Sequence, residues 1–222
     1  MPPTSRSRSA QRLSNDEAKA RTRAALIAAG LELFAQHGLD GPSLDAICEH
    51  AGFTRGAFYV HFRDRDDFLV AVMETVGLEV LDALLGSGGV DLEGMMERFV
   101  GAVRGAAYPL MGRGEGHARV RPHQLLHACA RSPAIRARYL ALVAESTSRM
   151  KEGARLSQRR GTVRADVDAG ALASLLMALV VGLETLADLG APLDLSRAAP
   201  ALLTLLAPTA AAKGKRRPRV KA

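Results

Sequence analysis

The chain has 222 residues, of which 48% are hydrophobic and 24% charged, and its formal net charge is +7. This length and apolar fraction are sufficient for a buried core, but aromatic residues make up only 4% and Trp is absent, so aliphatic side chains must fill most of that core. Alternating apolar and polar runs typical of strands are missing, which argues against a sheet and predicts an all-α protein.

The positive charge is concentrated at the two ends of the chain. Residues 1–23 carry +4 and residues 213–222 carry +6 of the total of +7, so the remaining residues carry −3. We expect residues 1–13 to form a basic flexible arm and residues 208–222 a basic disordered tail, because both are poor in apolar side chains. Arg6, Arg8 and Arg12 suit an arm that enters a minor groove, and a solvated tail is the alternative, which we favour for the C-terminal segment.

A long helix is predicted for residues 14–37. Ser14 and Glu17 have the spacing of a capping box, and Ile27, Leu31 and Phe34 continue an apolar stripe that begins at Ala24. Gly38 ends the pattern, and the sequence Gly-Pro at 41–42 turns the chain toward the next element.

Two short helices with a tight turn between them follow. Ser43 is placed to cap a helix over residues 44–51, and Gly52 can end it. Thr54 caps a second helix in which Phe58 and Phe62 face inward. Residues 14–64 therefore predict a three-helix domain with a helix-turn-helix, the arrangement in which the second helix of the pair enters the major groove of DNA.

Residues 65–207 predict a larger helical bundle. Helical periodicity covers residues 65–85, 92–107, 122–130, 133–160, 168–189 and 194–206, and three glycines within residues 112–116 predict a mobile loop. Leucines of the last two helices cover more than one face, so we expect them to pack against their own domain and a further surface.

Several segments of the first domain resemble the DNA-binding domain of the TetR family of bacterial repressors. They are residues 26–34, 44–47, 51–54 and the run Tyr-Val-His-Phe at 59–62, and the resemblance extends over roughly residues 19–75. It implies phosphate contacts by Ser43, Thr54, Tyr59 and His61, and major-groove contacts by Arg55, Gly56 and Ala57. Arg65 stands where relatives usually have a lysine, and either cation can contact a phosphate. Ala57 replaces a common hydroxyl, so the operator sequence cannot be copied from a relative.

The resemblance also implies that the two apolar C-terminal helices pair with those of a second copy. The predicted dimer interface comprises Leu172, Leu175, Leu176, Leu179, Val180, Leu183, Leu202 and Leu205. Such a homodimer would place two recognition helices about 34 Å apart on a pseudo-palindromic operator.

A small-molecule effector within the bundle is the third implication, and flexible Met with polar His and Tyr are suitable lining residues. The candidates are Met73, Phe99, Tyr108, Met111, His123, His127 and Met150. The alternative for each Met or Phe is an ordinary core position.

Other sites have less support in the sequence. His123 and His127 share a helix face, but Cys129 points away from it, so we predict no metal site and no cofactor. Cys48 and Cys129 fall in different predicted domains, which argues against a disulfide. No nucleophile elbow or phosphate-binding glycine loop follows a strand, which argues against an enzyme.

The sequence therefore predicts a dimeric, ligand-responsive transcriptional repressor that binds double-stranded DNA. The alternatives are a nonspecific DNA-binding protein that uses its basic ends and, with less support, a helical-bundle enzyme. The first residues lack the apolar stretch of a signal peptide, and the run between Asp168 and Glu184 is too short to cross a bilayer of about 30 Å. We therefore expect a cytoplasmic, nucleoid-associated protein without membrane contact.

Overall fold

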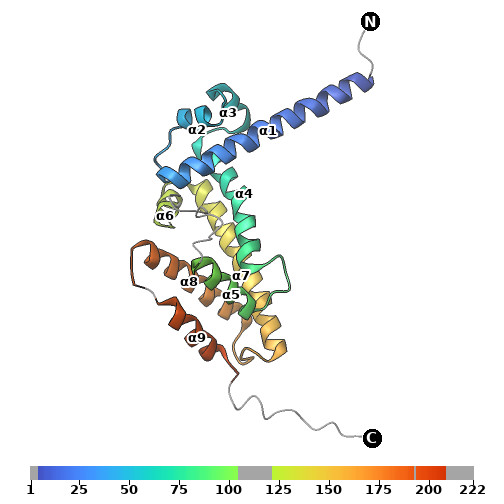
Figure 1. The fold of residues 1–222 in the computed structure, drawn as a ribbon. Helices are drawn as coiled ribbons and strands as arrows, with labels where there is room; N and C mark the ends of the chain where they lie inside the picture. Colours follow the sequence, from blue (N-terminus) through green and yellow to red (C-terminus); the bar gives the residue numbers. More distant parts are fainter. Residues whose placement is uncertain (1–4, 105–121, 193, 209–222) are drawn as a thin grey trace. The chain divides into compact units, whose positions relative to one another are not determined.

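A computed structural model describes residues 5–104, 122–192 and 194–208 of the chain (Figure 1). Within these ranges there are nine α-helices and no strand, which confirms the all-α prediction. The helices are α1 (Ser5–His37), α2 (Leu44–His50), α3 (Arg55–His61), α4 (Arg65–Leu85), α5 (Leu92–Arg104), α6 (Pro122–Arg131), α7 (Pro133–Arg160), α8 (Ala169–Asp188) and α9 (Leu195–Leu206).

The start of α1 corrects one prediction. The helix begins at Ser5, nine residues before the expected capping box at Ser14, so much of the segment expected to be a flexible arm is helical. Residues 10–13 include no Gly or Pro, and an existing helix gains one backbone hydrogen bond for each residue it adds. Figure 1 shows these first turns of α1 extending beyond the part that lies beside α2 and α3.

The chain divides into two compact units. Unit 1 comprises Met1–Val76 and Gly114–Arg138, and unit 2 comprises Gly77–Arg113 and Tyr139–Ala222. This division differs from the predicted boundary after residue 64, because the first turns of α4 and the whole of α6 group with the N-terminal helices. An ion pair between Arg131 of α6 and Asp40, at 2.7 Å, lies within unit 1.

Unit 1 has an aromatic centre despite the low aromatic content of the chain. Four of the six phenylalanines lie together there, Phe58 being 5.2 Å from Phe62 and 5.3 Å from Phe68 between ring centroids. Phe34 of α1 completes the group at 6.1 Å from Phe68. A Cβ at Gly30 would lie 2.5 Å from the Phe68 ring, so glycine there allows α1 and α4 to approach closely.

The predicted stripe of α1 is only partly buried. Ile27 and Phe34 are buried as expected, whereas Ala24 is exposed and Leu31 half-buried. Leu26 and Leu33 are buried as well, so the core-facing side of α1 is centred about one residue away from the predicted stripe.

Unit 2 is an aliphatic bundle. Its core consists of Leu81, Leu85, Leu92, Met95, Met150, Ala154, Val163, Ala169, Leu172, Ala173 and Leu176. One polar side chain is fully buried among these helices: Ser157 accepts a hydrogen bond from the backbone N–H of Leu92 at 3.0 Å. This bond satisfies an N–H at the beginning of α5 that has no partner within the helix.

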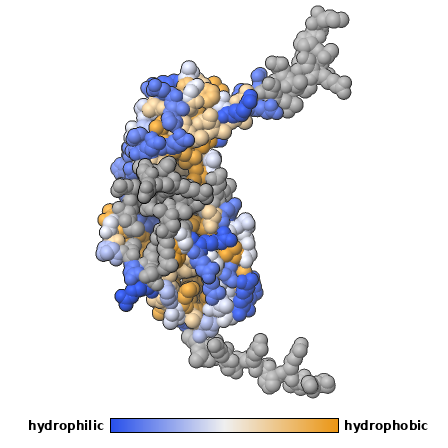
Figure 2. Space-filling view, in the orientation of Figure 1, coloured by the Kyte–Doolittle hydropathy of each residue, from blue (hydrophilic) through white to orange (hydrophobic). Residues whose placement is uncertain are grey.

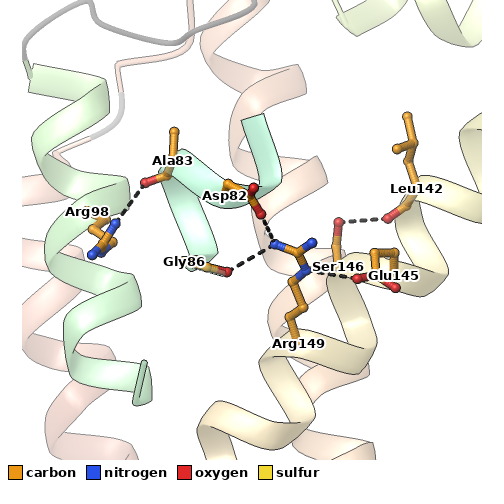
Figure 3. A network of polar contacts seen from close by, with 8 residues as sticks. All are labelled: Asp82, Ala83, Gly86, Arg98, Leu142, Glu145, Ser146 and Arg149. Atoms are coloured by element: carbon orange, nitrogen blue, oxygen red, sulfur yellow. Dashed lines mark hydrogen bonds and ion pairs between the residues drawn. The ribbon is translucent and has the colours of Figure 1, made fainter. Parts of the chain in front are cut away.

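Arg149 ties α7 to the end of α4 (Figure 3). Its Nη1 donates to the carbonyl of Gly86 at 3.0 Å and to the carboxylate of Asp82 at 2.5 Å, while its Nε donates to Glu145 at 2.9 Å. A cation at the C-terminus of a helix is favourable, because the last carbonyls there carry partial negative charge. These bonds fix the register between α4 and α7.

The apolar helix α8 corrects the prediction about membrane spans. An 18-residue stretch, Ala169–Leu186, is long and apolar enough to cross a membrane by length and composition, whereas the run predicted to be too short ended before Glu184. A core helix passes the same test, and Leu172, Ala173 and Leu176 on α8 are packed in the core of unit 2.

Candidate nucleic-acid interface

The helix-turn-helix is built from capped ends and one glycine turn. The Ser43 hydroxyl accepts a hydrogen bond from the N–H of Ala46 at 3.1 Å, and the Thr54 hydroxyl accepts one from Ala57 at 3.3 Å. Gly52 has a φ of +74°, a conformation that L-residues with side chains rarely adopt, and it ends α2. Both predicted caps and the predicted stop are confirmed.

One face of α3 is anchored in the core of unit 1. Phe58 and Phe62 are 0% and 2% exposed, as predicted. The Tyr59 ring meets Phe58 edge to face at 5.5 Å between centroids, yet half of the Tyr59 residue remains exposed. These two buried phenylalanines anchor α3 in the core of unit 1, and this anchoring determines where the backbone of α3 presents the side chains on its other face.

The exposed face of α3 carries most of the predicted DNA contacts. Arg55, Gly56 and Tyr59 are exposed, and Ala57 and His61 are half-buried. Val60, 66% exposed, lies on the same short helix and is missing from the predicted contacts. The signal that could have identified it is its position between Tyr59 and His61, off the face defined by Phe58 and Phe62.

Arg55 of α3 makes polar contacts with one residue of α2 and one residue of its own helix. Its Nε lies 3.3 Å from Oδ1 of Asp45 on α2, and its Nη2 donates to the hydroxyl of Tyr59 at 3.4 Å. The hydrogen bond to Tyr59 and the nearby carboxylate of Asp45 raise the pKa of Arg55. Asp45 is a second residue that the sequence analysis missed, because the contact depends on the angle between two helices.

Basic residues of α1 lie near His61. Burial, with Arg23 and Lys19 nearby, lowers the pKa of His61 below its usual range. The Arg23 guanidinium lies 5.3 Å from the centroid of the Phe62 ring. Positive charge from α1 therefore adjoins the C-terminal end of α3, where the sequence predicted His61 as a phosphate contact.

Arg65 has internal partners. Its Nη1 donates to the carbonyl of Pro42 at 2.7 Å and its Nη2 to the carbonyl of Leu39 at 2.5 Å. Its guanidinium lies 5.6 Å from the Phe34 ring, and burial lowers its pKa. Both terminal nitrogens donate to backbone carbonyls and the residue is half-buried, so Arg65 in this geometry ties α4 to the connection between α1 and α2 and is less accessible to a phosphate than the exposed Arg55.

The predicted ligand residues fall in different parts of the chain. Met73 is buried in unit 1, where His123 and His127 are exposed on α6, whereas Phe99 and Met150 belong to unit 2. Met150 is part of the aliphatic core, which is the alternative role considered for it. Tyr108 and Met111 lie outside the described residues. In the described part of the chain, no group of three or more His, Cys, Asp or Glu side chains could hold a metal ion.

The predicted dimer residues divide between two environments. Leu172 and Leu176 are buried in the core of unit 2, so the prediction that they face a second copy is corrected by packing within their own unit. Leu175, Leu179 and Leu205 are exposed, by 68%, 41% and 71%. The remaining three, Val180, Leu183 and Leu202, are half-buried.

Comparisons with known proteins agree with this geometry. Residues 26–72 match the family model of bacterial regulatory proteins of the tetR family. The regulator AcrR of Shigella flexneri is 42% identical over 53 residues, which are 24% of this chain and 25% of that protein. SrpR of Pseudomonas putida is 44% identical over 52 residues, 23% of this chain and 24% of that protein. The matches thus span about a quarter of these curated relatives.

Solved structures extend the similarity to most of the chain. A TetR-family transcriptional regulator from Pectobacterium atrosepticum is 26% identical, with a TM-score of 0.62, and the alignment covers 86% of this chain and 94% of that one. The reduced form of NemR from E. coli has a TM-score of 0.68 at 18% identity, covering 84% and 96%, and indicates the fold alone. The N-terminal helices of the chain are therefore a DNA-binding domain of the TetR family of bacterial regulatory proteins, and the described residues have the all-helical fold of that family.

Proposed function

We propose that the chain is a homodimeric transcriptional regulator, a repressor that leaves its operator when a small molecule binds. The observation that carries this proposal is the face of α3 opposite its phenylalanines. Arg55, Gly56 and Tyr59 are exposed together on a helix that Phe58 and Phe62 anchor. A rigid helix with exposed polar groups at its N-terminal end suits reading of the major groove.

The capping hydroxyls have a second role in this proposal. Ser43 and Thr54 are exposed, and each accepts a bond from its own helix. A hydroxyl that accepts still has its O–H to donate, so a phosphate oxygen can bind without loss of the cap. With Tyr59 and His61 they would give phosphate contacts at both ends of α3.

Dimerisation through α8 and α9 is supported by the apolar side chains that these helices leave exposed. Leu175 of α8, Leu189 directly after α8 and Leu205 of α9 are each about 70% exposed. Figure 2 shows hydrophobic patches, in orange, among the hydrophilic ones on the visible surface of the described residues. A second copy that covers these leucines would produce the two-fold symmetry that a pseudo-palindromic operator requires.

Release by a ligand follows from linkage. A molecule that binds more tightly to a conformation with misplaced recognition helices must lower the affinity for DNA by the same factor. Repression is the simpler polarity, because occupying an operator needs no contact with the polymerase. The lining candidates are those predicted from the sequence, with the half-buried Phe99 of unit 2 as the first to substitute.

The test is fluorescence anisotropy of the full chain with duplexes from around its own gene, scrambled duplexes as competitor and salt as a variable. We expect competitor-resistant binding at two protomers or a multiple of two per site. Y59F should weaken it by roughly 2- to 12-fold, the value of one hydrogen bond, with the same melting temperature. Equal binding to scrambled duplexes would favour the nonspecific DNA-binding alternative, and no binding at low salt would contradict DNA binding.

A further inference from the structure

The contact between Asp45 and Arg55 joins the two helices of the helix-turn-helix on their exposed side. Nε of Arg55 lies 3.3 Å from Oδ1 of Asp45, and Nη1 donates to Oδ2 at 3.5 Å. On the other side of the guanidinium, Nη2 donates to the Tyr59 hydroxyl, and the Tyr59 ring centroid lies 6.0 Å from the guanidinium carbon. Arg55 is thus held between α2 and the second turn of α3.

This ion pair contributes little to folding stability. The side chains of Arg55 and Asp45 are 54% and 67% exposed, and ion pairs in such positions are weak because water screens them and two long side chains lose freedom. Its main effect is to restrict the direction in which the Arg55 guanidinium points. An unrestrained arginine on an exposed helix samples many rotamers, whereas here contacts on two sides restrict it.

The contacts leave donors available. Each terminal nitrogen of Arg55 uses one N–H, toward Asp45 or toward Tyr59, and each has a second N–H. Two parallel N–H groups of a planar fork match O6 and N7 of guanine in the major groove, the commonest base-specific contact in protein–DNA complexes.

We propose that Asp45 is a positioning residue that holds Arg55 for reading a guanine in each half-site. The inference rests on the proposed function, because it requires α3 to enter a major groove. Asp45 also disfavours the competing contact. A carboxylate beside the guanidinium repels a phosphate and offsets the charge that would attract one, whereas the edge of a guanine is neutral.

The experiment selects bound duplexes from a library with a random central segment of two helical turns, about 20 base pairs, and sequences them. The proteins are the full-length wild type, D45N, R55A, the D45N/R55A double variant and E49Q. Asn preserves the size of the side chain. Glu49 is exposed on the same helix, so E49Q removes the same charge from α2 as a matched control. Circular dichroism at increasing temperature confirms that each variant is folded.

We expect the wild type to select a pseudo-palindrome with one strongly preferred guanine in each half-site. D45N should reduce that preference by roughly tenfold, within the range of about 5- to 150-fold that one bidentate base contact supplies, and leave the other positions unchanged. E49Q should select the wild-type sequence. In the R55A background, D45N should cause no further change, because its effect passes through Arg55.

Three results would overturn the inference. They are an unchanged guanine preference in D45N, a uniform gain in affinity for all duplexes without a change in preference, and an effect of D45N that persists without Arg55. A wild type that enriches no sequence would instead contradict the proposed function itself. The two failures are therefore distinguishable in one data set.

Discussion

A substitution at Gly56 should change the affinity for DNA without lowering the stability of the fold, so it separates these two properties better than a change at the other candidate contacts. It is exposed in the first turn of α3, and a Cβ built on it would meet only the Thr54 hydroxyl, at 3.6 Å, an ordinary van der Waals contact. The folded protein therefore has space for a methyl group at this position. If glycine is present because the backbone of α3 lies against DNA, the methyl group conflicts with the DNA alone.

The G56A variant should accordingly be more stable and bind DNA less well. Alanine is favoured over glycine in a helix interior by up to about 1 kcal/mol, and less in a first turn, so the melting temperature should stay the same or rise by a few degrees. An extra methyl group in a closely packed contact costs about 1–3 kcal/mol, which corresponds to roughly 5- to 150-fold weaker operator binding.

The matched control for this variant is G101A. Gly101 is exposed on α5 in unit 2, and a Cβ there would meet nothing within 4 Å. G101A, in the interior of its helix, should give at least as large a gain in helix stability without any change in DNA affinity. Anisotropy titrations and thermal melts of the three proteins measure both quantities. Operator affinity in G56A equal to that of the wild type would refute the close approach of α3 to DNA at this residue.

Three further predictions concern Arg65, His61 and the exposed face of α8. R65A removes two bonds to backbone carbonyls, so the free energy of unfolding should fall by about 2–4 kcal/mol in denaturant titrations; an unchanged value with weaker DNA binding would restore Arg65 as a phosphate ligand. Because the pKa of His61 is lowered, the unfolded chain binds a proton that the folded chain rejects, so this residue costs stability as the pH falls below about 6.5 and none above it. A phosphate beside His61 favours its protonated form, so DNA affinity should increase from about pH 8 to pH 6 more in the wild type than in H61Q, and parallel slopes would exclude this contact. If the proposed dimer forms through α8, L175D should give a monomer in sedimentation equilibrium while L140D, at a leucine of α7 that is 57% exposed against 68% for Leu175, should not; a dimer in both variants would place the interface elsewhere.

Local features of unit 1 were predictable from the sequence because each depends on a few neighbouring residues. A hydroxyl before a helix caps it, and a glycine after a helix can adopt positive φ, so Ser43, Thr54 and Gly52 were identified from their positions alone. The spacing of Phe58 and Phe62 similarly indicated the buried side of α3. Once the buried side was identified, the residues on the remaining side of α3 could be predicted to be exposed, and they include most of the candidate DNA contacts.

Contacts between elements were not predictable in the same way. Arg65 reaches carbonyls 23 and 26 residues earlier in the chain, and no spacing rule connects a helix start to that turn. The pair of Asp45 and Arg55 depends on the crossing of α2 and α3. The sequence indicated Arg55 as a base contact, and only the arrangement in space shows that Asp45 contacts it.

The leucines of α8 show how one apolar helix can serve two surfaces. Leu172 and Leu176 are four residues apart, with Ala169 and Ala173 on the same side, and all four are in the core of unit 2. Leu175, Leu179 and Leu186 recur at four and seven residues, the period of a single helix face, and all three are exposed. The two sets therefore occupy separate faces of α8.

A sequence pattern cannot separate these faces, because both consist of leucine and alanine at helical spacing. The face with Leu172 and Leu176 is fully packed within the chain. Substitutions on this face should therefore destabilise unit 2 and give no information about assembly. The leucines of the second face are 41–68% exposed, so they have fewer contacts within the chain to lose. Each exposed leucine there would contribute about 1.5–3 kcal/mol if fully buried against a second copy. Several such leucines on each protomer suffice to offset the entropy lost when two chains associate, estimated at about 4–15 kcal/mol. The same amino acid at two adjacent positions thus has opposite roles, and L176A and L175A should differ accordingly: the first should lower the melting temperature, and the second the dimer affinity.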